Sequence, residues 1–206
     1  MKQILLFALI MTTCTNCVSN NRAEINISEL TYPADLAVVK RADWGWKKLL
    51  NEIDEHTINK ITIHHGGVVF SDTANVVEHL QQLQDWSRKE KKWIDIPYHF
   101  MIDLDGKIYE TRPINYPGDT NTDYDVRGHA LICVMGNYEE QILADAQLVA
   151  VINLSAFLAR NYNVGVKDIK GHKDYTETLC PGKDLYKYLA DSTIQQETVK
   201  LLGRTE

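Results

Sequence analysis

The stretch Lys60-Ile61-Thr62-Ile63-His64 decides the fold class, because it alternates and is rich in β-branched side chains, as β-strands are. His64 ends this strand, where its side chain can face a cleft, and Gly66-Gly67 interrupts the pattern. Successive side chains of a strand point to opposite faces, so His65 faces away from His64. We therefore assign His64 to a candidate site and His65 to a supporting role.

Strand-type and helix-type segments alternate on either side of this stretch. Two β-type runs around Asp105-Gly106 predict a hairpin, and the apolar run Ala130 to Met135 predicts a central buried strand. A helix capped by Asp72 or Thr73 and ending between 89 and 92, a second helix over 145–161, a short strand over 166–170 and a helix over 183–189 complete the pattern. The sequence therefore predicts an α/β fold, a single domain with a central mixed β-sheet flanked by helices.

The N-terminus has the features of an export signal. A short basic start precedes the apolar run Ile4 to Met11, and Thr12-Thr13-Cys14 follows. We interpret residues 1–13 as a lipoprotein-type signal peptide with Cys14 as the lipidated residue, although Thr13 and Met11 depart from the usual pattern. Plain secretion stays open as the alternative. Residues 14–35 are interpreted as a flexible tether and 36–206 as the domain, which gives an exported protein anchored in the membrane and facing the periplasm.

Composition narrows the class of protein further. The 206 residues carry a net charge of −6, which argues against nucleic acid as the main partner. Four cysteines are present, and Cys14 and Cys180 have other predicted roles, which leaves Cys17 in the tether and Cys133 in an apolar run. The chain is therefore not a disulfide scaffold, and Cys133 is interpreted as a small buried core residue.

Three residues have the chemistry of zinc ligands: His64, His172 in Gly171-His172-Lys173-Asp174, and Cys180 in Cys180-Pro181-Gly182. Three protein ligands leave the fourth tetrahedral position open for water, as in catalytic zinc sites. A lone buried histidine or cysteine is more often a packing residue, so spacing alone leaves the metal-site and core interpretations equally open.

Hydroxyl groups near the predicted ligands suggest how an amide is hydrolysed. Tyr98 and Thr178 can donate hydrogen bonds to a developing oxyanion, and Thr178 lies two residues before Cys180. Alternation allows only one of Tyr98 and His99 to face the cleft. Asp174 is interpreted either as an acceptor that orients a ligand imidazole or as a turn cap.

Four ordered blocks resemble the type-2 zinc-dependent N-acetylmuramoyl-L-alanine amidases, a family that includes the peptidoglycan recognition proteins and phage amidase-type lysozymes. The blocks are Lys40 to Gly45, Ile61 to Gly66, Trp93 to Gly106, and Gly171 to Gly182, and the resemblance covers roughly Val39 to Leu189.

The resemblance implies one zinc ion per chain, held by His64, His172 and Cys180, with Tyr98 as the catalytic tyrosine and Thr178 as the oxyanion-stabilising residue. It implies hydrolysis of the amide that joins the lactyl group of N-acetylmuramic acid to L-alanine of the stem peptide. The expected partners are peptidoglycan or muropeptides, and we expect a monomer. Arg112 and Arg127 are hypothesised to pair with a stem-peptide carboxylate.

The sequence departs from the family pattern at several positions. Pro97 and Lys92 stand where glycine is common, and His129 stands where a small residue is usual. Cys133 lies at about the point where recycling-type members carry a catalytic glutamate, which favours the tyrosine-using branch.

Two other functions compete with the amidase. A non-catalytic peptidoglycan-binding module is the first, but its members commonly replace the cysteine that this chain keeps as Cys180. A structural zinc domain is the second, and it needs a fourth protein ligand, for which His129 is the only candidate.

Overall fold

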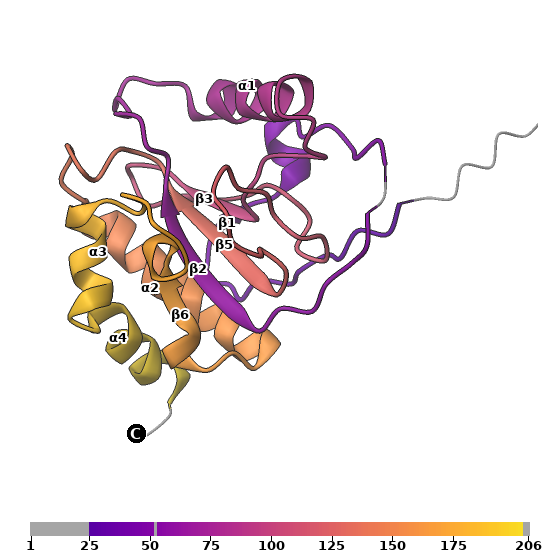
Figure 1. Ribbon diagram of the computed structural model, residues 1–206. Helices are drawn as coiled ribbons and strands as arrows, with labels where there is room; N and C mark the ends of the chain where they lie inside the picture. The colour runs from indigo at the N-terminus through magenta and orange to yellow at the C-terminus, as the bar shows by residue number, and fades with distance from the viewer. Residues whose placement is uncertain (1–24, 52, 204–206) are drawn as a thin grey trace, which may run out of the picture.

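The structure, a computed structural model, describes residues 25–51 and 53–203. A six-stranded sheet with the order β1-β4-β3-β5-β2-β6 forms its centre (Figure 1). All neighbouring strands are parallel except β3 and β4, which form the predicted hairpin, so the sheet is mixed as predicted. The strands are β1 (Val38–Val39), β2 (Lys60–His65), β3 (Phe100–Ile102), β4 (Ile108–Glu110), β5 (His129–Val134) and β6 (Ile169–Gly171).

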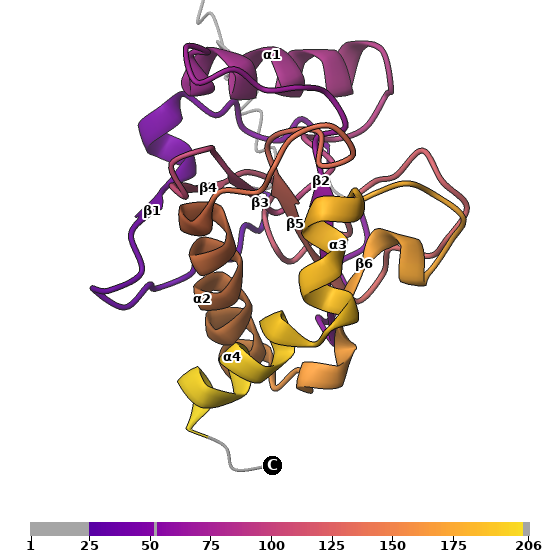
Figure 2. The same ribbon diagram turned by 90° about the vertical axis from the view of Figure 1, so that its left-hand side faces the viewer.

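Helices cover both faces of the sheet (Figures 1 and 2). Helix α1 (Val76–Lys89) lies over one face, and α2 (Asp145–Tyr162), α3 (Lys183–Ala190) and α4 (Thr193–Leu202) lie on the other. Three short 3₁₀ helices, η1 (Arg41–Trp44), η2 (Val166–Asp168) and η3 (His172–Asp174), occur in the connections.

Alternation along β2 divides the core between the two faces. Ile61 and Ile63 point toward α2 and join the larger hydrophobic cluster, which also contains Ile132 of β5. Met101 and Cys133 point toward α1 and join a smaller cluster with Leu80. The α2 face is thus packed with aliphatic side chains, and the α1 face keeps room for polar residues at its edge.

The structure corrects some predicted boundaries. Asn75, rather than Asp72 or Thr73, caps α1, because its Oδ1 accepts a hydrogen bond from the backbone N–H of Glu78 at 3.1 Å. The predicted strand over 166–170 is a 3₁₀ turn followed by β6, and α4 was not predicted. Lys92 has φ of 60°, a left-handed conformation that explains why glycine is common at this position.

Residues 25–35, the end of the predicted tether over 14–35, pack on the domain instead. Leu30 and Tyr32 contact the larger hydrophobic cluster. The hydroxyl of Tyr32 donates a hydrogen bond to the carboxylate of Glu110, which is 1 % exposed, and Arg41 pairs with the same carboxylate at 3.6 Å. This part of the tether prediction is wrong, because Tyr32 and Arg41 together bind the buried carboxylate of Glu110 and hold the segment on the domain. The predicted signal and Cys14 lie outside the described residues.

No helix within the part of the chain that the structure describes is long and apolar enough to cross a membrane.

We expect Tyr32→Phe to lower the free energy of unfolding by about 1.5–3 kcal/mol, the usual contribution of a hydrogen bond to a charged group. Urea denaturation followed by circular dichroism measures the change. Tyr162→Phe is the matched control, because it removes a hydroxyl from another ring packed against the same cluster. Equal stability of the Tyr32→Phe variant and the parent would mean that the hydrogen bond from Tyr32 to Glu110 does not stabilise the domain.

Candidate metal centre

Two parallel strands bring the predicted ligands to one edge of the sheet. His64 is near the C-terminal end of β2, and His172 directly follows the C-terminal end of its neighbour β6. Cys180 lies in the loop between η3 and α3. One ligand atom from each residue lies within 4.8 Å of the others, so the structure brings His64, His172 and Cys180 together as predicted.

The donor set fits a zinc ion. Nδ1 of His64 lies 3.6 Å from Sγ of Cys180, and two ligands of a tetrahedral zinc ion are about 3.5 Å apart when one is nitrogen and the other sulfur. Nδ1 of His172 is buried and has no hydrogen-bond partner within the described residues. A buried nitrogen without a partner is costly, and a metal ion would satisfy it.

No fourth histidine, cysteine or carboxylate joins this group among the described residues. His129, the only candidate for a structural zinc site, is at the opposite end of its strand and pairs with Lys60 in register. Its Nδ1 is 2.8 Å from the hydroxyl of Thr62. The geometry is therefore that of a three-ligand site with an open position.

Burial sets the ionisation of the ligands in the metal-free protein. It lowers the pKa of His64 well below its usual value, and it lowers the pKa of His172 to about 4. Both imidazoles are therefore neutral and able to bind a cation at neutral pH. Burial raises the pKa of Cys180 to about 12, so its thiol loses a proton only when a cation binds.

The backbone around Cys180 holds its sulfur in place. The N–H of His65 donates to Sγ of Cys180 at 3.3 Å, and the N–H of Cys180 donates to the Thr178 hydroxyl at 3.2 Å. The His65 ring accepts a hydrogen bond from the backbone of Tyr138 at 3.2 Å. His65 thus supports the site through its backbone, while its ring connects β2 to the loop after β5.

A pocket of about 490 Å³ opens beside the ligands on the α1 face. Its walls are mainly apolar. They include Met101 and Cys133 of the sheet, Met135 directly after β5, and Trp86 and Trp93 near the C-terminal end of α1. Cys133 is fully buried, which confirms the prediction of a core position.

Tyr98 lines this pocket, and His99 does not. The Tyr98 ring centroid is 5.2 Å from that of His64. Burial, reinforced by the neighbouring thiols of Cys133 and Cys180, raises the pKa of Tyr98 well above its usual value, so the hydroxyl keeps its proton. The His99 ring instead contacts the Tyr116 carbonyl at 2.9 Å and accepts from the N–H of Leu131.

Asp174 is a turn cap. Its carboxylate accepts hydrogen bonds from the Gly171 backbone at 2.8 Å and from the Tyr186 hydroxyl at 2.6 Å. One oxygen caps the turn that carries His172 and the other binds Tyr186 of α3, which favours the cap over the orienting role for this residue.

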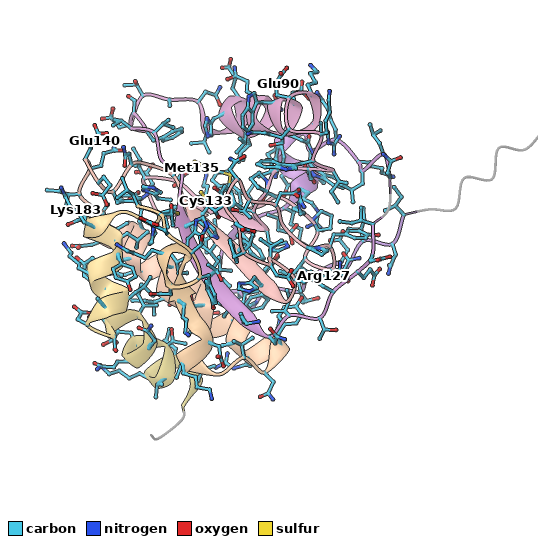
Figure 3. All side chains as sticks on the ribbon, in the orientation of Figure 1. Glu90, Arg127, Cys133, Met135, Glu140 and Lys183 are labelled. Atoms are coloured by element: carbon cyan, nitrogen blue, oxygen red, sulfur yellow. The ribbon has the colours of Figure 1, made fainter. Side chains whose placement is uncertain are left out.

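The structure brings neither predicted arginine to the pocket. Arg112 is 1 % exposed, and its guanidinium donates to the carbonyls of Asp95, Ile96 and Pro117 and to the Asp119 carboxylate. It therefore braces the pocket wall and has no exposed surface for a substrate carboxylate, which corrects the hypothesis. Arg127 donates to the carbonyl of Glu55 and lies far from Cys133 and Met135 (Figure 3).

Sequence reasoning missed two residues that contact the ligand imidazoles from outside. The hydroxyl of Thr122 is 2.7 Å from Nε2 of His172, and the hydroxyl of Tyr124 is 3.4 Å from Nε2 of His64. Both lie in the irregular loop between β4 and β5, where the only signal is a cluster of hydroxyl residues over 120–124.

Comparison with known proteins identifies the family. Residues 54–183 match the N-acetylmuramoyl-L-alanine amidase family, so the chain belongs to it. Peptidoglycan recognition protein 1 of Mus musculus is 30 % identical over 162 residues, which are 74 % of this chain and 85 % of the mouse protein.

Two solved structures share the fold. Drosophila peptidoglycan recognition protein SD superposes with a TM-score of 0.67 and 26 % identity, covering 75 % of this chain and 93 % of the other. The N-acetylmuramoyl-L-alanine amidase LysC from Clostridium intestinale superposes with a TM-score of 0.61 and 27 % identity, covering 82 % and 98 %. Both confirm the predicted α/β architecture.

We expect zinc binding at pH 6 to release about one proton per chain, from Cys180, because both imidazoles are already neutral. Two imidazoles with an ordinary pKa of about 6.5 would release about 1.5 further protons at this pH. Calorimetric titration of the metal-free protein in buffers of different ionisation enthalpy gives the number. A count near 2.5 would contradict the lowered histidine pKa values.

Proposed function

We propose that this member of the N-acetylmuramoyl-L-alanine amidase family is a zinc-dependent hydrolase that cleaves the amide between the lactyl group of N-acetylmuramic acid and L-alanine of peptidoglycan stem peptides. The observation that carries the proposal is the three-ligand cluster of His64, His172 and Cys180 at the edge of a pocket lined by Tyr98. The similarity to LysC, which is named as an amidase of this specificity, supports it.

Zinc bound to these residues would polarise the amide carbonyl and lower the pKa of a water ligand to about 7. Stabilisation of the oxyanion and exclusion of water are the roles of the protein's own side chains. Tyr98 stays protonated and can donate a hydrogen bond to the oxyanion of a tetrahedral intermediate. The apolar walls of the pocket exclude water and strengthen that hydrogen bond.

Thr178 is the second residue that we propose as a hydrogen-bond donor to the oxyanion. Its oxygen accepts the N–H of Cys180 at 3.2 Å, which leaves its own proton free to donate toward an oxyanion. The short loop from Thr178 to Cys180 therefore couples the position of this hydroxyl to that of the ligand sulfur.

Recognition of peptidoglycan without cleavage is the alternative function, and the similarity to the mouse and Drosophila recognition proteins supports it. Retention of all three ligands, Cys180 included, favours the enzyme over this alternative, because an open fourth position is typical of catalytic zinc sites.

We also propose that the protein is exported and anchored through a lipid on Cys14, with its domain in the periplasm. The basic start, the apolar run Ile4 to Met11 and the cysteine that follows support this proposal.

Mass spectrometry of muropeptides incubated with the zinc-loaded protein tests the enzymatic function. We expect free stem peptides that begin with L-alanine, and we expect chelator to abolish their release. Tyr98→Phe should keep stoichiometric zinc and lower kcat by about 10²-fold or more, as the loss of an oxyanion donor does. Stoichiometric zinc without cleavage, together with retained muropeptide binding, would establish the recognition function instead.

Metabolic labelling with radioactive palmitate tests the anchor in a bacterial host that processes lipoproteins. The full chain is expected to take up label, and Cys14→Ala is expected to take up none. Cys17→Ala is the matched control and should label like the parent. Labelling that persists in Cys14→Ala would overturn the lipid anchor at this residue.

A further inference from the structure

We propose that Thr122 and Tyr124, in the loop between β4 and β5, are positioning residues that hold both ligand imidazoles with Nδ1 directed at the metal. This inference rests on the metal site of the proposed function. It assigns a role to residues 120–124 of this loop, among which the sequence predicted no site residue.

Thr122 makes the closer of the two contacts. Its Oγ1 is 2.7 Å from Nε2 of His172, while Nδ1 of the same ring is buried without a partner. When Nδ1 binds a metal, its lone pair is used and the ring proton must lie on Nε2. The Thr122 oxygen then accepts that proton, which fixes both the tautomer and the rotation of the ring about its χ2 angle.

A neighbouring threonine orients the Thr122 hydroxyl. Thr122 Oγ1 lies 2.8 Å from Thr120 Oγ1, and the N–H of Thr122 donates to the same Thr120 oxygen at 3.1 Å. Since Thr122 accepts from His172, its own proton can go to Thr120. The resulting chain runs from His172 through Thr122 to Thr120, and it defines the direction of the Thr122 hydroxyl.

Tyr124 acts on the other imidazole. Its hydroxyl oxygen is 3.4 Å from Nε2 of His64, whose Nδ1 faces Sγ of Cys180. The Tyr124 ring stacks on Tyr175 with a centroid distance of 5.7 Å and an interplanar angle of 15°, and it lies 5.1 Å from the His172 ring. Tyr175 directly follows η3, so the loop with Tyr124 packs on the same segment that carries His172.

The chemistry of these acceptors has a consequence for the site. Ligand histidines often donate their second N–H to a carboxylate, which makes them more basic and adds negative charge. Thr122 and Tyr124 are neutral hydroxyl acceptors, so one thiolate is the only anion among the ligands and the residues that orient them. A divalent cation held by these residues would keep a net charge of +1 and would supply a strong Lewis acid at the site.

Metal affinity of the full chain tests the proposal without any substrate, so its outcome is independent of whether the protein cleaves muropeptides. We expect Thr122→Val, which preserves shape and removes the acceptor, to weaken zinc binding about 10–100-fold in competition with a chromophoric chelator. Thr122→Ser should restore affinity to within about threefold of the parent. Tyr124→Phe should weaken binding less than Thr122→Val, because its contact is longer.

The control is Thr57→Val, which makes the same change at an exposed position just before β2, at the opposite end of that strand from His64. Visible spectra of the Co²⁺-loaded proteins report ligand geometry. We expect Thr122→Val to change the spectrum and Thr57→Val to leave it like that of the parent. Zinc affinity of Thr122→Val within threefold of the parent, with an unchanged Co²⁺ spectrum, would overturn the proposal. If Thr122→Val does not fold, the comparison of Tyr124→Phe with the parent decides: equal affinity and spectrum overturn it.

Discussion

Parallel pairing of β2 with β6 is the constraint on which the candidate metal centre depends. Ile61 pairs with Ile169 and Ile63 with Gly171, so His64 and His172, which follow the last of these pairs, lie at the same level along the two strands. Isoleucine side chains on the opposite face pack under α2 and fix this register, because a slip by one residue would turn His64 into the apolar core. The ligand positions are thus a consequence of how the larger hydrophobic cluster packs.

The two faces of the sheet have different roles: one is packed with the larger hydrophobic cluster, and the other carries the candidate site. The α2 face is filled with aliphatic side chains, whereas the α1 face leaves a pocket where sulfur, imidazole and phenol groups meet. Burial keeps His64, His172 and Cys180 neutral, and the same burial keeps Tyr98 protonated. The low polarity of the pocket therefore keeps the imidazoles in the neutral form that binds a cation and keeps Tyr98 in the protonated form that can donate to an oxyanion.

The sequence predicted those parts of the site that regular elements carry. Alternation along β2 separates His64 from His65, but it leaves Tyr98 and His99 as alternatives. The family resemblance assigned Tyr98 and joined His172 and Cys180 to His64 as ligands. Thr122 and Tyr124 could not be predicted, because an irregular loop 50 residues before His172 has no periodicity that fixes which side chains reach the site. The hypothesis that Arg112 binds a substrate carboxylate was wrong, because a sequence does not show that buried backbone carbonyls will take up the donors of a guanidinium. The same limit hid Tyr32, whose partner Glu110 is 78 residues away.

The buried guanidinium of Arg112 has a further consequence for recognition. It holds the carbonyls of Ile96 and Pro117 and the carboxylate of Asp119, which lines the pocket, in one rigid frame. A wall held in this way keeps its shape before any ligand arrives, so association does not have to order it, and little conformational entropy is lost there. A molecule that binds against this wall would be selected by its fit to a fixed contour, rather than by adaptation of the wall.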